Sequence, residues 1–373
     1  MSFFNITKQY LAISPAAFGL DISDTSLKYV QLEPEEGYFD LRVYGQKDIP
    51  KGIVEKGVIK KPSELSAILK KSLVKEGPKG LSSYAVFSLP DEETFLKQIR
   101  LPEMSDDELE NAVYIEAEGN IPIDINDAYL DYNILKRHKD KNGFHIDVLL
   151  AAARRSSVDT YTEVLLEAGI TPVALEPEVV AISRSAILGG KSKEPVLIAE
   201  IGANRTRLVA FVEEAVVFTG AVNFSADALN ESLAKLLGME KSKIIRLTDK
   251  SEEFKDKKFA DAFEDALRVE LKPLVEAIQN YTVFYKTQEE KDGDTSRPFE
   301  KVLVSGGGSR APAIEKQLSL ILKVPTGQVN PWVNVLPPEL KETPQLNLDE
   351  SVRFTTAIGL ALRGIQNGLK EML

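Results

Sequence analysis

Cysteine is absent from the 373 residues of the chain, and histidine occurs only twice. The lack of cysteine excludes disulfide bridges, thiolate metal sites and a cysteine nucleophile. The scarcity of histidine disfavours a Ser-His-Asp hydrolase. Both histidines, His138 and His145, flank a polar stretch that predicts a solvated hairpin turn over 139–143, in preference to a metal site.

Long apolar runs and an excess of basic residues are missing as well. No run approaches the ~18 apolar residues of a membrane-spanning helix, and residues 1–11 lack the apolar core of a secretory signal. We expect that segment to pack on its own domain or to touch lipid or a partner. The formal net charge of −11 disfavours nucleic acid as a partner. Without cysteine or a signal, the chain is expected in the cytoplasm.

The composition that remains is typical of a soluble globular protein, with 43% hydrophobic and 28% charged residues. A chain of this length exceeds one ordinary core and predicts two or three domains. A module of helices and strands is expected over 49–143, where Ser105 and Glu108 form a capping box at the start of a helix. From residue 144 onward strands and helices alternate, which favours a parallel or mixed sheet covered by helices.

The first motif with chemical meaning is a tight polar turn between two strands, predicted over 18–22 and 27–32. Backbone N–H groups and hydroxyls in such a turn bind phosphate oxygens. Asp21 cannot face a phosphate without repulsion, so we expect it to hold Mg²⁺ through bridging water. The predicted contacts of this first hairpin are Asp21, Ser23, Asp24, Thr25, Ser26 and Lys28.

The same pattern returns in the second half of the chain. Strands expected over 196–201 and 208–212 flank a turn, and Leu20–Ser23 aligns with Ala199–Gly202, so that an acid stands near the end of each first strand. We interpret this match as an internal duplication. The predicted contacts of this second hairpin are Gly202, Asn204 and Thr206, with Glu200 as the second acid near the metal.

A third motif is the run of three glycines after a strand predicted over 301–305, with a helix expected from about Ala313. Such a turn beside a helix start lets a flat ring or a phosphate lie against the main chain. It is neither a Walker A motif nor a dinucleotide fingerprint, because no Lys-Ser/Thr pair follows and the spacing differs. The predicted contacts are Gly306, Gly307, Gly308 and Ser309.

The order of these motifs resembles the actin/hexokinase/DnaK superfamily. In that superfamily two related lobes clamp ATP between two phosphate hairpins and a glycine-rich adenosine loop. Glu178–Arg184 and Ala357–Ala361 are similar to its two connecting helices. The resemblance implies ATP and Mg²⁺ as ligands of the predicted contacts.

Residues 49–143 carry a closer resemblance. Leu101–Leu109 is similar to the LPxMxxxEL stretch of PilM proteins, and Ile115–Ile123 followed by Tyr129–Tyr132 is similar to their WEAExYIPF…YLDF signature. Gly52–Val58 resembles the start of the same module. The chain therefore resembles the PilM family of type IV pilus assembly proteins over most of its length.

This resemblance implies an α/β fold of the actin-like (ribonuclease H-like) kind. The implied fold is two-lobed, with a duplicated core and an FtsA-type α+β insertion in the first lobe. The implied domains are a first-lobe core of residues 1–48, 144–192 and 345–373, an SHS2-like inserted module of 49–143, a second-lobe core of 193–229 and 298–344, and a helical subdomain of 230–297.

The resemblance also implies partners and a location. PilM-type proteins bind the short cytoplasmic N-terminal peptide of PilN, which is expected to dock as an extended segment near the inserted module. The protein would then lie at the inner face of the cytoplasmic membrane, touching the membrane only through its partners. Contacts with other platform proteins and the pilus ATPase are implied, while self-association and weak ATP hydrolysis are left open.

Several positions depart from the family and keep alternatives open. Glu200 stands where Asp is usual, and Ala277 and Gln279–Asn280 stand where a Glu and a basic pair are expected. The metal and nucleoside contacts are therefore in question, and a nucleotide-free scaffold is one alternative. A small-molecule kinase is another, although no third acid is visible as a base for a substrate hydroxyl. An FtsA-like cell-division protein is the last, although Thr355–Leu373 shows no linker before a membrane helix.

Overall fold

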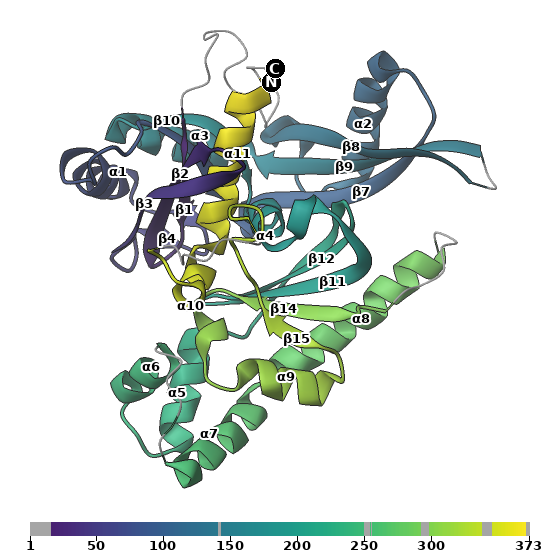
Figure 1. Ribbon diagram of the computed structural model, residues 1–373. Helices are drawn as coiled ribbons and strands as arrows, with labels where there is room; N and C mark the ends of the chain where they lie inside the picture. Colours follow the sequence, from purple (N-terminus) through teal and green to yellow (C-terminus); the bar gives the residue numbers. More distant parts are fainter. Residues whose placement is uncertain are drawn as a thin grey trace. The chain divides into compact units, whose positions relative to one another are not determined.

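The computed structural model describes residues 16–140, 143–249, 254, 256–291, 298–337 and 345–370, so the N-terminal segment 1–11 lies outside the described residues. The chain divides into two compact units (Figure 1). The first unit takes the described parts of Met1–Ser185, Trp332–Gln345 and Thr356–Leu373, and the second takes those of Ala186–Pro331 and Leu346–Thr355. None of the helices in these described ranges is both long and apolar enough to cross a bilayer.

The first unit is built on a five-stranded sheet with the order β10-β6-β1-β2-β3. Its strands are β1 (Phe18–Ile22), β2 (Ser26–Glu35), β3 (Tyr38–Asp48), β6 (Tyr84–Leu89) and β10 (Thr171–Pro177). β2 is antiparallel to β1 and β3, whereas β6 is parallel to β1 and β10. The sheet is therefore mixed, as the alternation of strands and helices predicts.

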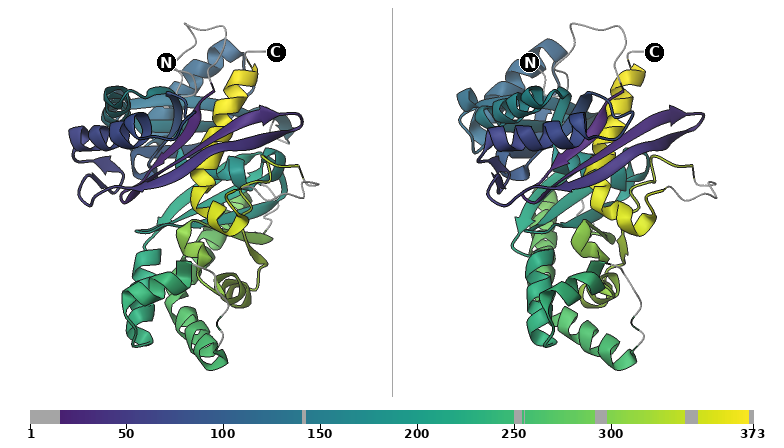
Figure 2. Two further views of the ribbon diagram at one scale, coloured as in Figure 1. Left: turned by 60° about the vertical axis from the view of Figure 1, so that its left-hand side comes forward. Right: turned by 90° about the vertical axis from the view of Figure 1, so that its left-hand side faces the viewer.

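Helices cover both faces of this sheet. On one face, α1 (Pro62–Leu69), its π-helical extension Lys70–Lys75 and α3 (Arg155–Ala168) bury the alternate side chains of β1. On the other face, α4 (Glu178–Ala186) and α11 (Thr355–Lys370) contribute Ala181 and Leu360 to a second cluster. Figure 2 shows β2 and β3 in purple and α11 in yellow from two sides. Pro62 is the first residue of α1, where the missing N–H of proline costs no helical hydrogen bond.

A separate three-stranded antiparallel sheet has the order β7-β9-β8. Its strands are β7 (Thr94–Pro102), β8 (Ala128–Asp140) and β9 (Gly143–Arg154). α2 (Asp106–Asn120) packs on it through Leu109, Val113 and Ala117. The predicted capping box at the start of α2 is confirmed. His138 and His145 lie directly opposite each other in the β8–β9 ladder, which confirms the predicted hairpin. Residues 141–142 of its turn lie outside the described residues.

The sheets to which β6 and β9 belong differ from those that the expected boundaries of the inserted module, 49–143, imply. β6 lies inside that range, yet it pairs with β1 in the five-stranded sheet. β9 was expected to open the next part of the first-lobe core at 144, yet it pairs with β7 and β8. Strand periodicity marks a strand but not its partner, so these pairings were not visible from the sequence. The domain division and the FtsA-type character of the insertion stay predictions.

The second unit repeats the topology of the first. Its sheet has the order β13-β12-β11-β14-β15. The strands are β11 (Ser192–Ile201), β12 (Thr206–Glu213), β13 (Ala215–Val222), β14 (Lys301–Ser305) and β15 (Thr326–Gln328). β12 is antiparallel to both neighbours and β14 is parallel to both. Order and direction match β3-β2-β1-β6-β10, which confirms the predicted duplication.

Helices of the second unit bury one face of its sheet against a large apolar cluster. They are α5 (Ala226–Leu236), α6 (Lys241–Asp249), α7 (Lys257–Glu270), α8 (Lys272–Lys291) and α9 (Ile314–Leu322). The short α10 (Leu348–Ser351) also belongs to this unit. The apolar periodicity of 230–248 and of 260–287 is that of one helix in each range, yet each range forms two helices. Gly238 adopts φ +62° after α5, and Pro273 cannot donate a backbone hydrogen bond, so each ends a helix that periodicity alone continues.

The remaining regular elements are short. Val54–Glu55 (β4) and Val58–Ile59 (β5) form a small hairpin in the first unit. The 3₁₀ turns are η2 (Asp91–Glu93), η3 (Ile125–Asp127), η4 (Leu188–Gly190), η5 (Gly307–Arg310) and η6 (Val352–Phe354). Two of them, η5 and η6, adjoin the candidate site of the second unit.

Candidate functional site

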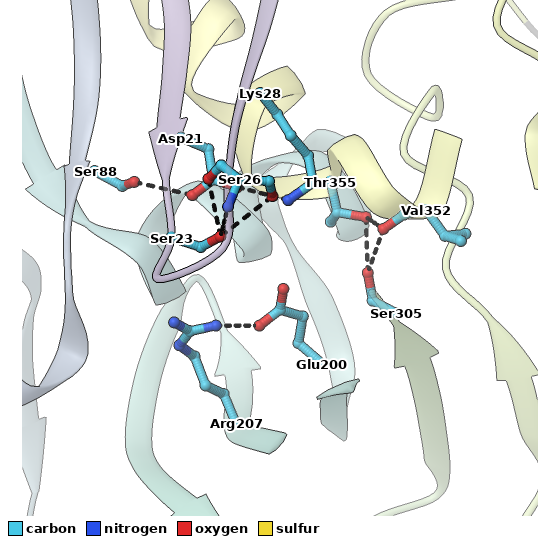
Figure 3. Close-up of polar contacts among 10 residues, drawn as sticks. All are labelled: Asp21, Ser23, Ser26, Lys28, Ser88, Glu200, Arg207, Ser305, Val352 and Thr355. Atoms are coloured by element: carbon cyan, nitrogen blue, oxygen red, sulfur yellow. Dashed lines mark hydrogen bonds and ion pairs between the residues drawn. The ribbon is translucent and has the colours of Figure 1, made fainter. Parts of the chain in front are cut away.

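The turn of the first hairpin is closed by one serine. Ser23 Oγ donates to the carbonyl of Ser26 at 2.9 Å and accepts from the Ser26 N–H at 3.2 Å, while the Ser23 N–H also donates to the Ser26 carbonyl at 2.9 Å (Figure 3). Thr25 at the tip is exposed. The hydroxyl-rich turn therefore forms as predicted, and the hydrogen bonds of Ser23 fix its backbone conformation.

Asp21 stands near the end of β1, with 7% of its surface exposed. Its carboxylate lies 3.5 Å from Lys28 Nζ and accepts from Ser88 Oγ at 3.4 Å (Figure 3). Asp21 and Lys28 are directly opposite in the β1–β2 ladder. The structure thus brings together two predicted contacts and adds Ser88, at the end of β6, which the sequence did not indicate.

Asp24 holds the neighbouring hairpin of β4 and β5. Its two carboxylate oxygens accept from the N–H groups of Lys56 and Gly57, both at 3.0 Å. Both residues of this two-residue turn have positive φ, 51° and 75°. Tyr161 Oη donates to the Gly57 carbonyl at 2.9 Å, and burial raises the pKa of Tyr161, which keeps it a donor. Asp24 therefore has a supporting role that the sequence did not show, and its contact with a nucleotide stays a prediction.

The second hairpin is tied to the helix that follows the sheet. The Gly202 N–H donates to the Arg205 carbonyl at 2.9 Å, and the Gly202 carbonyl accepts from the Ala226 N–H at 2.9 Å. Thr206 is fully buried, and its hydroxyl donates to the Phe224 carbonyl at 2.9 Å. Thr206 therefore has a supporting role in the hairpin, and its contact with a phosphate stays a prediction. Asn204, at the tip of the turn, is exposed.

Glu200 pairs with a cation that the sequence analysis missed. Arg207 Nη1 donates to Glu200 Oε2 at 2.5 Å, and the two side chains are only 10% and 14% exposed (Figure 3). They are directly opposite in the β11–β12 ladder. The observed turn at 202–205 places residue 200 opposite residue 207 in an antiparallel hairpin. The expected second strand, 208–212, begins one residue too late to include Arg207.

The acids as they stand do not fit the predicted magnesium ion. Mg²⁺ is held through carboxylate oxygens and retained waters, but Asp21 lies beside Lys28 and Glu200 is bound by Arg207. Throughout the described part of the chain, no three histidines, aspartates or glutamates are grouped so as to hold a metal. In the structure each of these acids forms an ion pair within its own hairpin, and the binding of Mg²⁺ by Asp21 and Glu200 stays a prediction.

The triple-glycine turn packs directly on the end of β11. Gly306 has φ +80°, and a Cβ there would be 2.5 Å from the Ile201 carbonyl oxygen. A Cβ on Gly308 would be 2.3 Å from Ile201 Cγ2. Gly307 is exposed, and its nearest neighbour for a Cβ is Arg353 Cγ at 4.0 Å. Two glycines are thus required by packing, while the middle one presents main chain on the surface of this unit.

Hydroxyl groups fix the turn in place. Ser305 Oγ and Thr355 Oγ1 are 2.7 Å apart (Figure 3). The Gly306 N–H donates to the Val352 carbonyl at 3.1 Å. Ser309 is 2% exposed and donates to the Gly306 carbonyl at 2.8 Å. Ser309 therefore stabilises the turn, and its contact with a ligand stays a prediction.

A depression of about 900 Å³ lies beside this turn in the second unit, where Ser309, Arg310, Glu264 and Lys316 contribute to its wall. Arg310 donates from Nη2 to Asp349 Oδ2 at 2.7 Å and is 7% exposed. The sequence analysis did not single out Arg310 or Asp349.

The three predicted segments fall in different units. The first hairpin belongs to the first unit, whereas the second hairpin and the triple-glycine turn belong to the second. Packing of Gly306 and Gly308 against Ile201 joins the latter two. Convergence of all three around one ligand stays a prediction. On α8, Gln279 and Asn280 are exposed, which leaves the doubt about nucleoside contacts from this helix as it was.

Comparison with known proteins gives two findings. The model of the family described as type IV pilus assembly protein PilM matches residues 19–365. A solved structure described as the PilM-PilN type IV pilus biogenesis complex is 26% identical in sequence, with 94% of this chain and 99% of that chain covered and a TM-score of 0.73.

A more distant solved structure is the ethanolamine utilization protein EutJ from Carboxydothermus hydrogenoformans. It is 13% identical, with 96% of this chain and 94% of that chain covered and a TM-score of 0.51. At this identity the likeness concerns the fold alone.

Proposed function

Since the chain belongs to the family of type IV pilus assembly protein PilM, we propose that it is an assembly factor of the inner-membrane platform of a type IV pilus. The family match over residues 19–365 carries this proposal. The fold is actin-like with a duplicated core, as predicted. Membership of this family favours the assembly role over the cell-division protein and the small-molecule kinase.

The proposed partner is the cytoplasmic N-terminal peptide of a PilN-type protein. Support comes from the 26% identical structure, which is described as a complex of PilM with PilN. In this proposal the chain is cytoplasmic and is held at the inner face of the cytoplasmic membrane only through partners. Other platform proteins and the pilus ATPase are further proposed partners, and self-association stays open.

ATP is the proposed ligand of the two hairpins and the triple-glycine turn. The serine-closed turn at Ser23, the cations Lys28 and Arg207, and the exposed main chain at Gly307 are the features that favour a polyphosphate. Any hydrolysis is expected to be weak, because Glu200 is already engaged by Arg207.

Titration with a synthetic PilN-type N-terminal peptide tests the assembly role. We expect saturable binding to the full chain by calorimetry, and no binding of a peptide with the same residues in shuffled order. Repeating the titration with ATP, with ADP and without nucleotide measures coupling, because a nucleotide shifts the peptide affinity only if it prefers one conformation. Absence of saturable binding in all three conditions would reject the proposed partner.

Substitution of Gly307 by alanine is expected to weaken ATP binding about tenfold, equivalent to losing one charge-assisted hydrogen bond. The folded chain has room for the methyl group, since the nearest atom for a Cβ is 4.0 Å away. A ligand lying against the main chain would lose its close approach. The measurement is calorimetric titration with ATP beside urea unfolding.

The matched variant is Gly308→Ala, one residue further along the same turn. Its Cβ would lie 2.3 Å from Ile201 Cγ2, so we expect its free energy of unfolding to fall by about 1–3 kcal/mol. If Gly307→Ala bound ATP as tightly as the original chain, the turn would not be the ATP contact.

A further inference from the structure

The two hairpins share an arrangement of charged residues that becomes evident once their strands are paired. In each, an acid near the end of the first strand faces a cation seven residues later, Asp21 with Lys28 and Glu200 with Arg207. Both pairs occupy directly opposite positions in their ladders. The duplication therefore extends to charge: each hairpin neutralises its own acid with its own cation.

The pair in the second hairpin is the tighter of the two. Glu200 and Arg207 approach to 2.5 Å, whereas Asp21 and Lys28 are 3.5 Å apart. With 14% and 10% of the side chains exposed, the Glu200–Arg207 pair is poorly solvated, so its charges are screened less than those of a surface pair. A guanidinium stays protonated at any physiological pH and matches phosphate oxygens in geometry.

The position of this pair is next to the predicted phosphate contacts of the same unit. Glu200 is followed by Ile201, the residue against which Gly306 and Gly308 pack. Arg207 directly follows Thr206, whose hydroxyl fixes the hairpin to the Phe224 carbonyl. The guanidinium is thus carried by a strand whose position is set by hydrogen bonds within the second unit, which limits the entropy lost when it binds an anion.

A metal ion bound by Glu200 would have to displace the Arg207 guanidinium or lie beside it. Magnesium loses its waters reluctantly and needs carboxylate oxygens, and the oxygen Oε2 of Glu200 already accepts from Arg207 at 2.5 Å. Two cations on one carboxylate repel each other in a poorly solvated place. Charge balance therefore favours the arginine alone.

We propose that Arg207, oriented by Glu200, is the cation with which the second hairpin binds a phosphate group of the nucleotide, so that nucleotide binding needs no divalent metal. This inference rests on the proposed ATP binding. It assigns Arg207 as a ligand contact and Glu200 as a positioning residue rather than a metal ligand.

Calorimetric titration of the full chain with ATP, in excess Mg²⁺ and in excess EDTA, tests the metal dependence. The two dissociation constants are expected to agree within about threefold, a small difference on a scale where 1.4 kcal/mol is tenfold. A loss of tenfold or more in EDTA overturns the inference while leaving ATP binding in place. Absence of ATP binding in both conditions refutes the proposed ATP binding itself, and the inference with it.

Variants separate ligand contact from a structural role. Arg207→Met is expected to weaken metal-free ATP binding about tenfold or more, the effect of losing one charge-assisted hydrogen bond. The ATP affinity of Arg207→Lys is expected to lie between those of Arg207→Met and the original chain. Glu200→Gln removes the carboxylate charge but keeps a hydrogen-bond acceptor for Arg207, so its ATP dissociation constants in Mg²⁺ and in EDTA are expected to agree within about threefold. Unchanged affinity in Arg207→Met, or loss of Mg²⁺-supported binding in Glu200→Gln, overturns the assignment.

Arg100→Met is the matched control, because Arg100 also faces an acid, Asp147, across a ladder and at 2.8 Å. That pair lies in the three-stranded sheet of the first unit, so its loss is expected to leave ATP affinity unchanged. Urea unfolding of each variant shows which are folded. If Arg207→Met does not fold, Arg207→Lys and Glu200→Gln decide the question by the same EDTA comparison.

Discussion

Replacing Gly359 with alanine is expected to lower the free energy of unfolding by about 3 kcal/mol, at the upper end of overpacking costs. A Cβ at Gly359 in α11 would be 1.9 Å from the carbonyl oxygen of Ala181 in α4 and 3.0 Å from its Cα. These are backbone atoms, so the two helices must separate. Separation also loosens the hydrogen bond from Arg184 to the Gly359 carbonyl, now 3.0 Å. Urea unfolding followed by circular dichroism measures the change.

The matched control is Gly119→Ala, which places the same methyl group in another helix, α2. No atom lies within 4 Å of a Cβ at Gly119, so helix propensity acts alone and predicts a gain of about 0.5–1 kcal/mol. Equal stability of Gly359→Ala and the original chain would mean that α4 and α11 are not in backbone contact.

A second glycine extends this argument to the first hairpin. A Cβ at Gly19 in β1 would be 2.1 Å from the Ala357 carbonyl oxygen in α11. Helix α11 is therefore in close contact with the backbone of β1 at Gly19 and with the backbone of α4 at Gly359, since neither glycine leaves room for a side chain. Asp21 comes two residues after Gly19 in the same strand, so the position of the first hairpin depends on α11.

Local patterns made much of the candidate site predictable. The turn at Ser23, the strand before Gly306 and the acid near the end of each first strand are all encoded within a few neighbouring residues. Aligning Leu20–Ser23 with Ala199–Gly202 predicted the duplication, and the two sheets do share strand order and direction. Alternation and turn residues act over short distances, so these features did not depend on the rest of the fold.

Contacts between distant segments could not be predicted in this way. Asp24 accepts from the N–H groups of Lys56 and Gly57, more than thirty residues away, and no local pattern connects them. The partners of β6 and β9 are likewise set by which apolar faces meet during folding. Arg207 was missed for another reason, because the strand expected over 208–212 begins too late to include it. Only a strand that starts at Thr206 places Arg207 opposite Glu200.

Glu176→Gln is expected to cost about 3 kcal/mol, the range found when one partner of a buried ion pair is removed. Glu176 is 1% exposed, and both its oxygens accept from Arg184, with Nη2 to Oε2 at 2.8 Å. Burial lowers the pKa of Arg363 in α11, and the negative charge of Glu176 acts in the opposite direction. Loss of the carboxylate leaves two poorly solvated guanidiniums without that compensating charge. Urea unfolding at neutral pH measures the cost.

The double variant Glu176→Leu with Arg184→Met distinguishes the ion pair from packing. Removing both charges together is expected to recover much of the loss, because no uncompensated charge then stays buried. A single-variant cost below about 1 kcal/mol, as for an exposed pair, would mean that water reaches Glu176. Because Arg184 also donates to the Gly359 carbonyl, the recovery should be incomplete. The part not recovered then measures how far the hydrogen bond from Arg184 fixes α4 against α11, the helix on which β1 and its hairpin rest.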